Sequence, residues 1–378
     1  MNIVAALLLC CGAFWSVRLA VAETFFRDDT APAIKRATAM QGNAPSADFE
    51  ERLAEIEPAD ARIALETAVG INPRASGAWI SLGLLEESSD DLAAAERSLL
   101  TAARIDHQFL PAWTLTNFYF RRGDREAFWR WAKQAASLTF DDFLPLIRLC
   151  DQLEPDATQA LTRLGEVRRL RPTYLGFLID EKRLDAAQRV ARGMFHDHAN
   201  DAYLINLADH QLGAGNTAAA IEVWNVASGF EPIDPAARRV LTNGNLARAP
   251  LNLGFDWRLG QEAGIITNWA PSQLTFDLSG SEAESAMFMK QTLSTVPDHW
   301  HLRFDYATRG ALSPGIRWSL NEKEGPLIEP SDQWRTGDFP LPRTRGSGEL
   351  KLIYRREPGT TRATGRIEIR NLRLEASL

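Results

Sequence analysis

The sequence predicts a helical repeat region followed by an antiparallel β-sandwich, with an apolar leader helix in front. Three observations predict this order: the first residues are mostly apolar, residue types recur every 34 positions between about 65 and 136, and apolar and polar residues alternate after residue 248. A period near 34 is typical of stacked helix pairs, and alternation is typical of strands with one buried face. The expected organisation is a leader at 1–22, a linker at 23–45, helical repeats at 46–248 and the sandwich at 249–378.

The leader reads MNIVAALLLCCGAFWSVRLAVAETFF. Its apolar run from Ile3 to Trp15 fits the core of a signal peptide, and the small residues at 20–22 offer a cleavage site. The same stretch is also long enough for an uncleaved membrane anchor, with Arg18 near one end. We favour the anchor. The expected location is the cell envelope, with the bulk of the chain in the periplasm, either anchored at the inner membrane or released if the leader is cleaved.

The middle of the chain repeats itself in register. Six residues recur 34 positions later: Ala78 as Ala112, Trp79 as Trp113, Leu85 as Tyr119, Asp90 as Asp124, Ala93 as Ala127, and Ala102 as Ala136. Gly83 and the alanines allow two helices to approach closely, while Trp79 and Leu85 fill the groove to the next pair. This pattern resembles the tetratricopeptide repeat, and the resemblance implies a solenoid that binds a protein partner through its concave face. Candidate groove residues are Trp113, Phe128 and Trp131, although aromatic residues on a helix also commonly lie in the core.

Less regular helical patterns continue to about Arg248. The segment DPAARRVL predicts a closing helix with Asp234 as N-cap and Pro235 in the first turn. The segment GAGNTA from Gly213 matches a dinucleotide-binding fingerprint, but no strand precedes it, so we interpret it as a turn between two helices. No cofactor is therefore expected.

Six alternating runs indicate the sandwich: QLTFDLSG, AMFMKQTLS, HWHLRFDYATRG, GIRWSLNE, GELKLIYRRE and GRIEIRNLRLEA. They predict an antiparallel jelly roll of about eight strands. In HWHLRFDY, alternation places Trp300, Leu302, Phe304 and Tyr306 on the buried face and His299, His301, Arg303 and Asp305 on the outer face. The two histidines could suggest a metal site, but the outer faces of the other runs are mostly cationic, so no metal is expected.

Three tryptophans lie in loop-like stretches beside polar residues: Trp257 in GFDWRLGQ, Trp269 in TNWAPSQ and Trp334 in SDQWRTGD. An exposed indole ring can stack on a sugar while polar neighbours bind its hydroxyl groups, so these are candidate saccharide-contacting residues. The alternative is that they close the ends of the sandwich.

The runs GFDWRL, WHLRFDYATRG, PGIRWSL and LKLIYRREPGTTRATGRIEIRNLRL together resemble the C-terminal module of membrane-associated tetratricopeptide proteins from bacterial exopolysaccharide-assembly systems. That module is similar to family 4/6-type carbohydrate-binding jelly rolls. The resemblance implies a scaffold or polymer contact at the envelope and supplies no catalytic residues.

Composition and motifs favour a binding protein. The net charge of −7 over 378 residues argues against a nucleic-acid partner. The expected function is a non-enzymatic envelope scaffold, with polysaccharide or another subunit on the jelly roll and a protein partner on the solenoid. The alternative is a polysaccharide-acting enzyme or its accessory subunit, which would need two carboxylates across a cleft. Carboxylates are available at Asp256, Asp277, Glu282, Glu284 and Asp305, but their spacing does not pair any two, and no catalytic residue is assigned.

Overall fold

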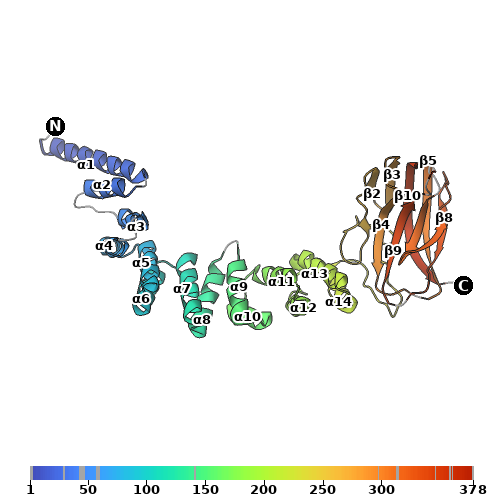
Figure 1. The fold of residues 1–378 in the computed structure, drawn as a ribbon, viewed down its shortest axis with the longest axis horizontal. Coiled ribbons are helices and arrows are strands. Elements are labelled where there is room, and N and C mark those ends of the chain that lie inside the picture. The colour runs from blue at the N-terminus through green and yellow to red at the C-terminus, as the bar shows by residue number, and fades with distance from the viewer. Residues whose placement is uncertain are drawn as a thin grey trace. The chain divides into compact units, whose positions relative to one another are not determined.

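The computed structural model describes residues 3–28, 30–41, 47–56, 60–139, 142–296, 298–311, 315–344, 346–356, 359 and 361–376. The chain forms two compact units, Met1–Leu170 and Arg171–Leu378. The first unit is helical, and the second contains helices followed by two antiparallel sheets (Figure 1). The predicted order of a helical region and then a β-sandwich is confirmed.

Helices of the first unit are α1 (Ile3–Arg27), α2 (Ala31–Gln41), α3 (Ala47–Ile56), α4 (Ala61–Ile71), α5 (Ser76–Ser88), α6 (Leu92–Ile105), α7 (Phe109–Arg122), α8 (Arg125–Leu138), α9 (Leu144–Leu153) and α10 (Ala157–Leu164). The second unit begins within α11 (Leu170–Asp180) and continues with α12 (Leu184–Arg192), the 3-10 turn η1 (His198–Asn200), α13 (Asp201–Gly213) and α14 (Thr217–Ala227). The segment after Gly213 is the turn between α13 and α14, as expected.

Small side chains and N-caps explain the helix pairs. The repeated alanines at 78, 102, 112 and 136 are all buried, and a Cβ atom on Gly83 would lie 2.7 Å from the Leu99 side chain. The second helices start at Asp91 and Asp124, whose carboxylates accept hydrogen bonds from Ala94 and Ala127. The predicted match of Asp90 with Asp124 is therefore wrong by one position, because Asp91 is the residue that takes the same place as Asp124. The helix pairs agree with the repeat pattern, and the tetratricopeptide assignment stays a prediction.

The leader forms helix α1. Its C-terminal part packs on the next two helices through Ala22, Ile34 and Leu53. Within the described residues, no helix combines the length and the hydropathy needed to cross a membrane. Signal peptide and anchor both stay predictions.

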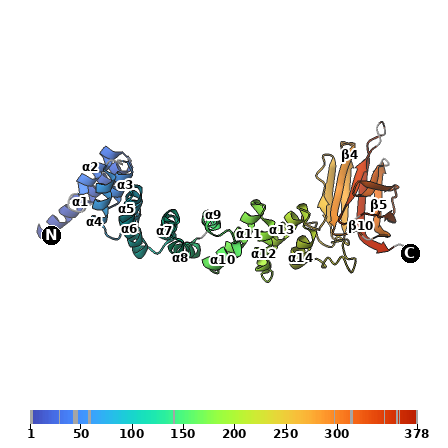
Figure 2. The same cartoon turned by 60° about the horizontal axis from the view of Figure 1, so that its bottom comes forward.

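Ten strands in two sheets form the described part of the sandwich (Figure 2). One sheet has the order β1 (Arg258–Leu259), β4 (Ser285–Leu293), β9 (Gly348–Arg355), β6 (Ile316–Leu320), β7 (Lys323–Leu327). The other has the order β2 (Ile265–Ala270), β3 (Gln273–Ser279), β10 (Thr364–Ala376), β5 (Trp300–Ala311), β8 (Arg335–Pro340). Every strand pair is antiparallel.

The sandwich core follows the predicted phase of β5. Leu302, Phe304 and Tyr306 are buried, and the ring of Phe304 lies 5.5 Å from that of Trp318 in the facing sheet. Trp300, the first residue of the strand, was predicted to be buried but is only half-buried. Alternation places the polar residues of the same strand on the outer face.

The segment between α14 and the first strand packs against the sandwich. Asp234 caps a turn, where its side chain accepts hydrogen bonds from the N–H groups of Ala236 and Ala237, and the predicted closing helix is absent from this described segment. Instead of forming a helix, the chain turns back after Asp234 and forms an isolated antiparallel bridge between Asp234 and Arg239. Leu246 is fully buried in the sandwich core, so the packing begins before residue 249.

Asp256 lies in this segment with a fully buried side chain. One carboxylate oxygen accepts a hydrogen bond of 2.7 Å from the N–H of Leu251, and the other has no partner. Burial raises the pKa of Asp256 from 3.8 to about 6, although the hydrogen bond from the N–H of Leu251 opposes the shift. A carboxyl group with a raised pKa binds its proton more tightly in the folded chain than in the unfolded chain. Its contribution to stability is therefore complete below pH about 4 and is lost as the pH rises through 6.

We expect Asp256→Asn to stabilise the protein more at pH 7.5 than at pH 4.5, because it removes the cost of burying a charge. The difference should be of the order of 2 kcal/mol, at about 1.4 kcal/mol per pKa unit. Thermal unfolding of both proteins at the two pH values measures it. An equal change in Tm at both pH values would contradict the assignment.

Candidate functional site

The three candidate saccharide-contacting tryptophans have different environments. Trp257 is fully buried in the sandwich core, its ring lies 6.1 Å from that of Trp318, and its Nε1–H donates to the carbonyl of Asn243. A fully buried ring cannot stack on a sugar, so this candidate is wrong. Trp269 and Trp334 are each 37% exposed.

Trp269 lies on the edge strand β2. Its Nε1–H donates a hydrogen bond of 3.0 Å to the carbonyl of Leu246. The N–H of Ser272 donates to the same carbonyl. Trp269 therefore holds the segment before the sandwich in place, and its candidate role in sugar contact stays a prediction.

Trp334 directly precedes β8, at the opposite edge of the same sheet. Its ring lies against Arg370 of β10, with 3.8 Å between the ring centroid and the guanidinium carbon. Asp305 of β5 lies 3.9 Å from the Arg370 Nε atom. Asp305 accepts hydrogen bonds of 2.8 Å from both Thr336 and Asn371. We call these five residues the Trp334 surface.

The charge of Asp305 is fixed by its neighbours. Partial burial raises the pKa of this carboxyl, but hydrogen bonds from Asn371 and Thr336 and the charges of Arg373 and Arg370 hold the pKa below its usual range. The carboxylate is therefore ionised at neutral pH and keeps Arg370 beneath the indole ring. Because cation–π contact orients a half-exposed ring without burying it, part of Trp334 stays available to a ligand.

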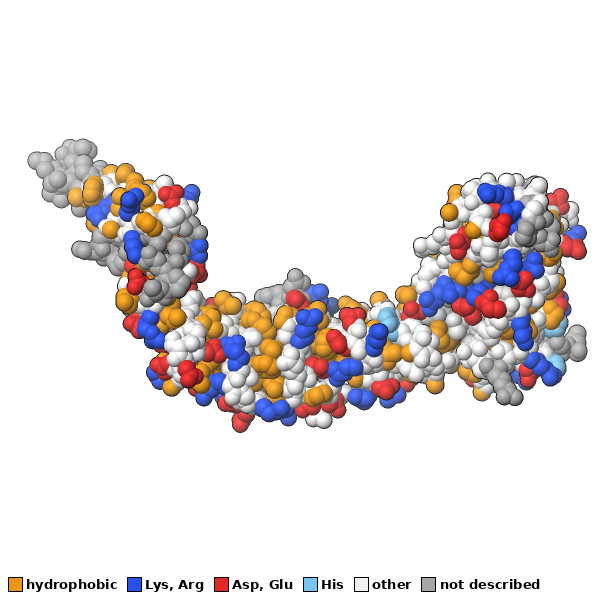
Figure 3. Space-filling view, viewed as in Figure 1, with side chains coloured by type: hydrophobic (Ala, Val, Ile, Leu, Met, Phe, Trp, Pro, Cys, Tyr) orange, Lys and Arg blue, Asp and Glu red, His pale blue; other side chains and the backbone are white. Residues whose placement is uncertain are grey.

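Charged side chains cover the outer face of this sheet. Asp277 pairs with Arg366 at 2.6 Å, and Asp338 lies within 3.3 Å of both His301 and Arg303. Acidic and basic side chains are mixed over the sandwich in the view of Figure 3. His299 precedes the strand and lies 2.7 Å from Arg343. Within the described residues no group of three His, Cys, Asp or Glu is placed to hold a metal ion.

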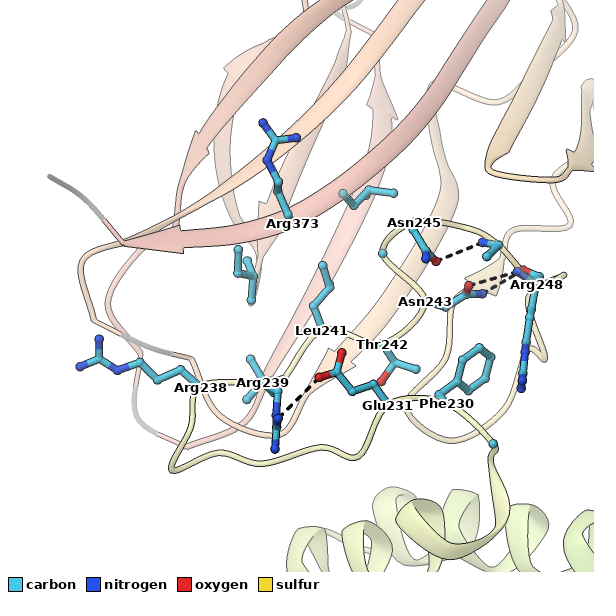
Figure 4. A pocket seen from close by; sticks show the side chains of 16 residues that line it. Phe230, Glu231, Arg238, Arg239, Leu241, Thr242, Asn243, Asn245, Arg248 and Arg373 are labelled. Atoms are coloured by element: carbon cyan, nitrogen blue, oxygen red, sulfur yellow. Dashed lines mark hydrogen bonds and ion pairs between the residues drawn. The ribbon is translucent and has the colours of Figure 1, made fainter. Parts of the chain in front are cut away.

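A polar pocket of about 450 Å³ lies beside the sandwich, lined by segments 229–231, 238–245, 247–248 and 372–374. We call it the linker pocket. Figure 4 shows that segment 229–248 supplies most of its side chains and that Arg373 comes from β10. The Asn243 side chain closes the wall by hydrogen bonds to both backbone groups of Arg248, at 3.0 Å and 3.4 Å.

The backbone of Gly244 fixes this pocket to β10. The N–H of Leu372 donates a hydrogen bond of 2.7 Å to the Gly244 carbonyl, and a Cβ atom on Gly244 would lie 2.2 Å from the Leu372 carbonyl oxygen. The sequence did not predict this pocket, because part of the segment was expected to form a helix. The signal available was three arginines between 238 and 248, interleaved with asparagines.

The predicted groove residues of the helical unit also differ in how deeply they are buried. Phe128 is fully buried, with its ring 5.1 Å from that of Trp129, so it belongs to the core and this candidate is wrong. Trp113 is half-buried, and its ring stacks on that of Phe109 at 6.0 Å. These two rings, with Leu138, Pro145 and Leu146, line an apolar hollow of about 430 Å³. Trp131 is half-buried, and its ring nitrogen is buried without a partner.

No protein-family model and no curated protein matches the chain. Among solved structures, the chain is similar to a CBM29-2 mutant, a family 29 carbohydrate-binding module, complexed with cellulohexaose: 17% identity, 36% of this chain, 87% of that chain and a TM-score of 0.25. It is also similar to a CBM29-2 mutant complexed with mannohexaose, with 17% identity over 31% of this chain and 78% of that chain and a TM-score of 0.21. A CBM4 structure is 8% identical over 36% of this chain and 99% of that chain, with a TM-score of 0.27. Similarities at these TM-scores carry no functional argument for this chain.

We expect Gly244→Ala to destabilise the protein by about 1–3 kcal/mol, because the added methyl group would overlap the Leu372 carbonyl. Gly213→Ala is the matched control in the same unit, since a Cβ atom there meets no other atom within 4 Å. Thermal unfolding compares the two variants. Equal stability of both would show that the close approach of Gly244 to β10 is not a constraint.

Proposed function

We propose that this protein is a non-enzymatic scaffold of the cell envelope, whose sandwich binds polysaccharide and whose helical unit binds a protein partner. Its sequence resemblance to exopolysaccharide-assembly proteins favours a role in the assembly or export of such a polymer. The observation that carries the proposal is the Trp334 surface.

The Trp334 surface has the two components that sugar binding requires. The half-exposed indole ring offers an apolar face for the C–H groups of a pyranose ring. Arg370 lies against this ring, Asp305 lies beside Arg370, and Asn371 donates to Asp305, so these residues offer charged and amide groups for hydroxyl groups. Since Asp305 holds these groups in place before any ligand arrives, little conformational entropy is lost on binding.

The carboxylates support binding over catalysis. Asp277 and Glu284 are paired with Arg366 and Arg356, at 2.6 Å and 2.9 Å. Asp256 is fully buried, whereas Asp305 is partly exposed. A glycosidase needs an acid and a base or nucleophile that face one bond. The arrangement of these groups therefore favours a binding role.

The hollow at Phe109 and Trp113 supports a protein partner for the helical unit. Stacked aromatic rings with aliphatic neighbours form a surface that fits apolar side chains of a peptide segment. Leu110 of the same helix is also exposed, at 56%.

Replacement of Trp334 by alanine in the full chain should weaken polysaccharide binding about tenfold or more, equivalent to about 1.4 kcal/mol. Affinity electrophoresis in gels containing neutral or acidic polysaccharides measures this. Trp113→Ala, in the other unit, is the control and should bind as the wild type does. Unchanged binding by Trp334→Ala would remove the Trp334 surface from the proposal.

Trp113→Ala should in turn reduce recovery of the partner when the protein is cross-linked in its source cells, because the stacked pair in the hollow is lost. Tyr203→Ala, which removes an exposed aromatic side chain from α13, controls for general loss of apolar surface. Equal recovery from both variants would place the partner elsewhere.

A further inference from the structure

The linker pocket has a charge that differs from that of the whole protein. The chain carries 49 acidic and 42 basic residues, yet four arginines and one glutamate line this pocket. Two of the arginines have acidic neighbours: Arg239 lies 3.5 Å from Glu231, and Arg373 lies 2.6 Å from Glu375. Cationic clusters in a concave surface raise the local concentration of anions.

The other two arginines, Arg238 and Arg248, make no ion pair with any residue that the structure describes. Arg238 lies over the ring of Trp300, with 5.7 Å from its guanidinium carbon to the ring centroid, and Arg248 lies over Phe230 at 5.2 Å. An aromatic ring holds a guanidinium group in place through one face and leaves its N–H groups free to bind a carboxylate. Both cations are therefore positioned and available.

The wall of the pocket also contains an unsatisfied polar group. Thr242 is buried, and its backbone N–H and carbonyl are both bound by the Gln291 side chain, at 3.1 Å and 2.7 Å. The Thr242 hydroxyl has no hydrogen-bond partner. Because a buried polar atom without a partner is costly, this part of the pocket wall carries an uncompensated polar group.

The arrangement of the arginines favours a long anion over a small one. Figure 4 shows Arg238 and Arg373 extending in different directions from the linker and from β10, while Arg248 lies alongside Phe230. Cations spread around an open pocket match charges repeated along a polymer better than a single phosphate or sulfate ion. The aromatic rings next to Arg238 and Arg248 hold both cations in place for the carboxylates of such a polymer.

We propose that the linker pocket binds the carboxylate groups of an acidic polysaccharide, such as a polyuronate, through Arg238 and Arg248. This inference rests on the proposed function, since it names the class of polysaccharide that the sandwich binds. The Trp334 surface, which stacks on sugar rings, and the linker pocket, which binds their carboxylates, are separate sites of one binding unit.

The test uses the full chain with polygalacturonate, a neutral β-glucan and a single-stranded oligonucleotide as probes, at 20 mM and 300 mM NaCl. The wild type should prefer polygalacturonate and bind it at least tenfold more weakly at the higher salt concentration, because salt screens exposed charges. Arg238→Gln with Arg248→Gln should weaken this binding tenfold or more and leave any β-glucan binding unchanged. Arg104→Gln with Arg189→Gln removes the same charge from the helices and should have no effect.

Four results would overturn the inference. Equal binding of polygalacturonate by the two double variants would show that the pocket is not the site. Binding of the neutral glucan alone would leave the proposed function in place and remove acidic recognition, whereas absence of binding to either polysaccharide would remove both. Preference for the oligonucleotide would show that the cations serve a different polymer. Circular dichroism checks that each variant is folded. Arg248→Lys in place of Arg248→Gln should restore part of the affinity for polygalacturonate, because lysine keeps the positive charge.

Discussion

An irregularity in strand β10 determines both surfaces of the sandwich. Between Arg370 and Arg373, this strand places two residues, Asn371 and Leu372, opposite one residue of β5. Asn371 adopts a left-handed conformation with φ of 51°, which turns its amide to Asp305. Leu372 turns into the core, and its backbone binds Gly244. Bulges of this kind commonly redirect side chains near functional sites.

The consequence is a division of roles along one strand. Arg370, before the bulge, lies under Trp334, while Arg373, after it, reaches the linker pocket. Segment 229–248 completes the pocket only because Gly244 allows its backbone to approach β10. The same segment is tied to the core by Leu246 and to the edge strand by Trp269. The sandwich and the segment before it are therefore one structural unit.

Sequence patterns predicted the parts of this structure that depend on local periodicity. The alternation in HWHLRFDY predicted which face of β5 is buried, and small residues at a period near 34 predicted the helix pairs. The pattern could not distinguish Trp257, which is buried, from Trp334, which is exposed, because both lie beside Gly, Asp and Arg in loop-like stretches. The difference depends on tertiary packing against Trp318, far along the chain.

The segment DPAARRVLTNGNLAR, whose first part DPAARRVL was predicted to form the closing helix, was the main error, for a physical reason. Its first residues have helical propensity, but the Asp234 side chain caps a turn, and Arg238, within the predicted helix, adopts a left-handed conformation with φ of 60° that a helix cannot contain. Asn243 and Leu246, further along, are left-handed as well. The stretch from 243 to 246 is held by contacts with β10 and β2, so its conformation has no local signal. In β10, by contrast, Asn371 interrupts the alternation of IEIRNLRL, and this break marks the bulge in the sequence.

Hydrogen–deuterium exchange of the full chain, with and without a polygalacturonate oligosaccharide, tests the central claim most directly. We expect slower exchange at two surfaces of the second unit. The Trp334 surface corresponds to residues around 331–338 and 370–374, and the linker pocket to residues around 238–248. Slower exchange confined to the helices of the first unit, or no change anywhere at saturating oligosaccharide, would contradict the account.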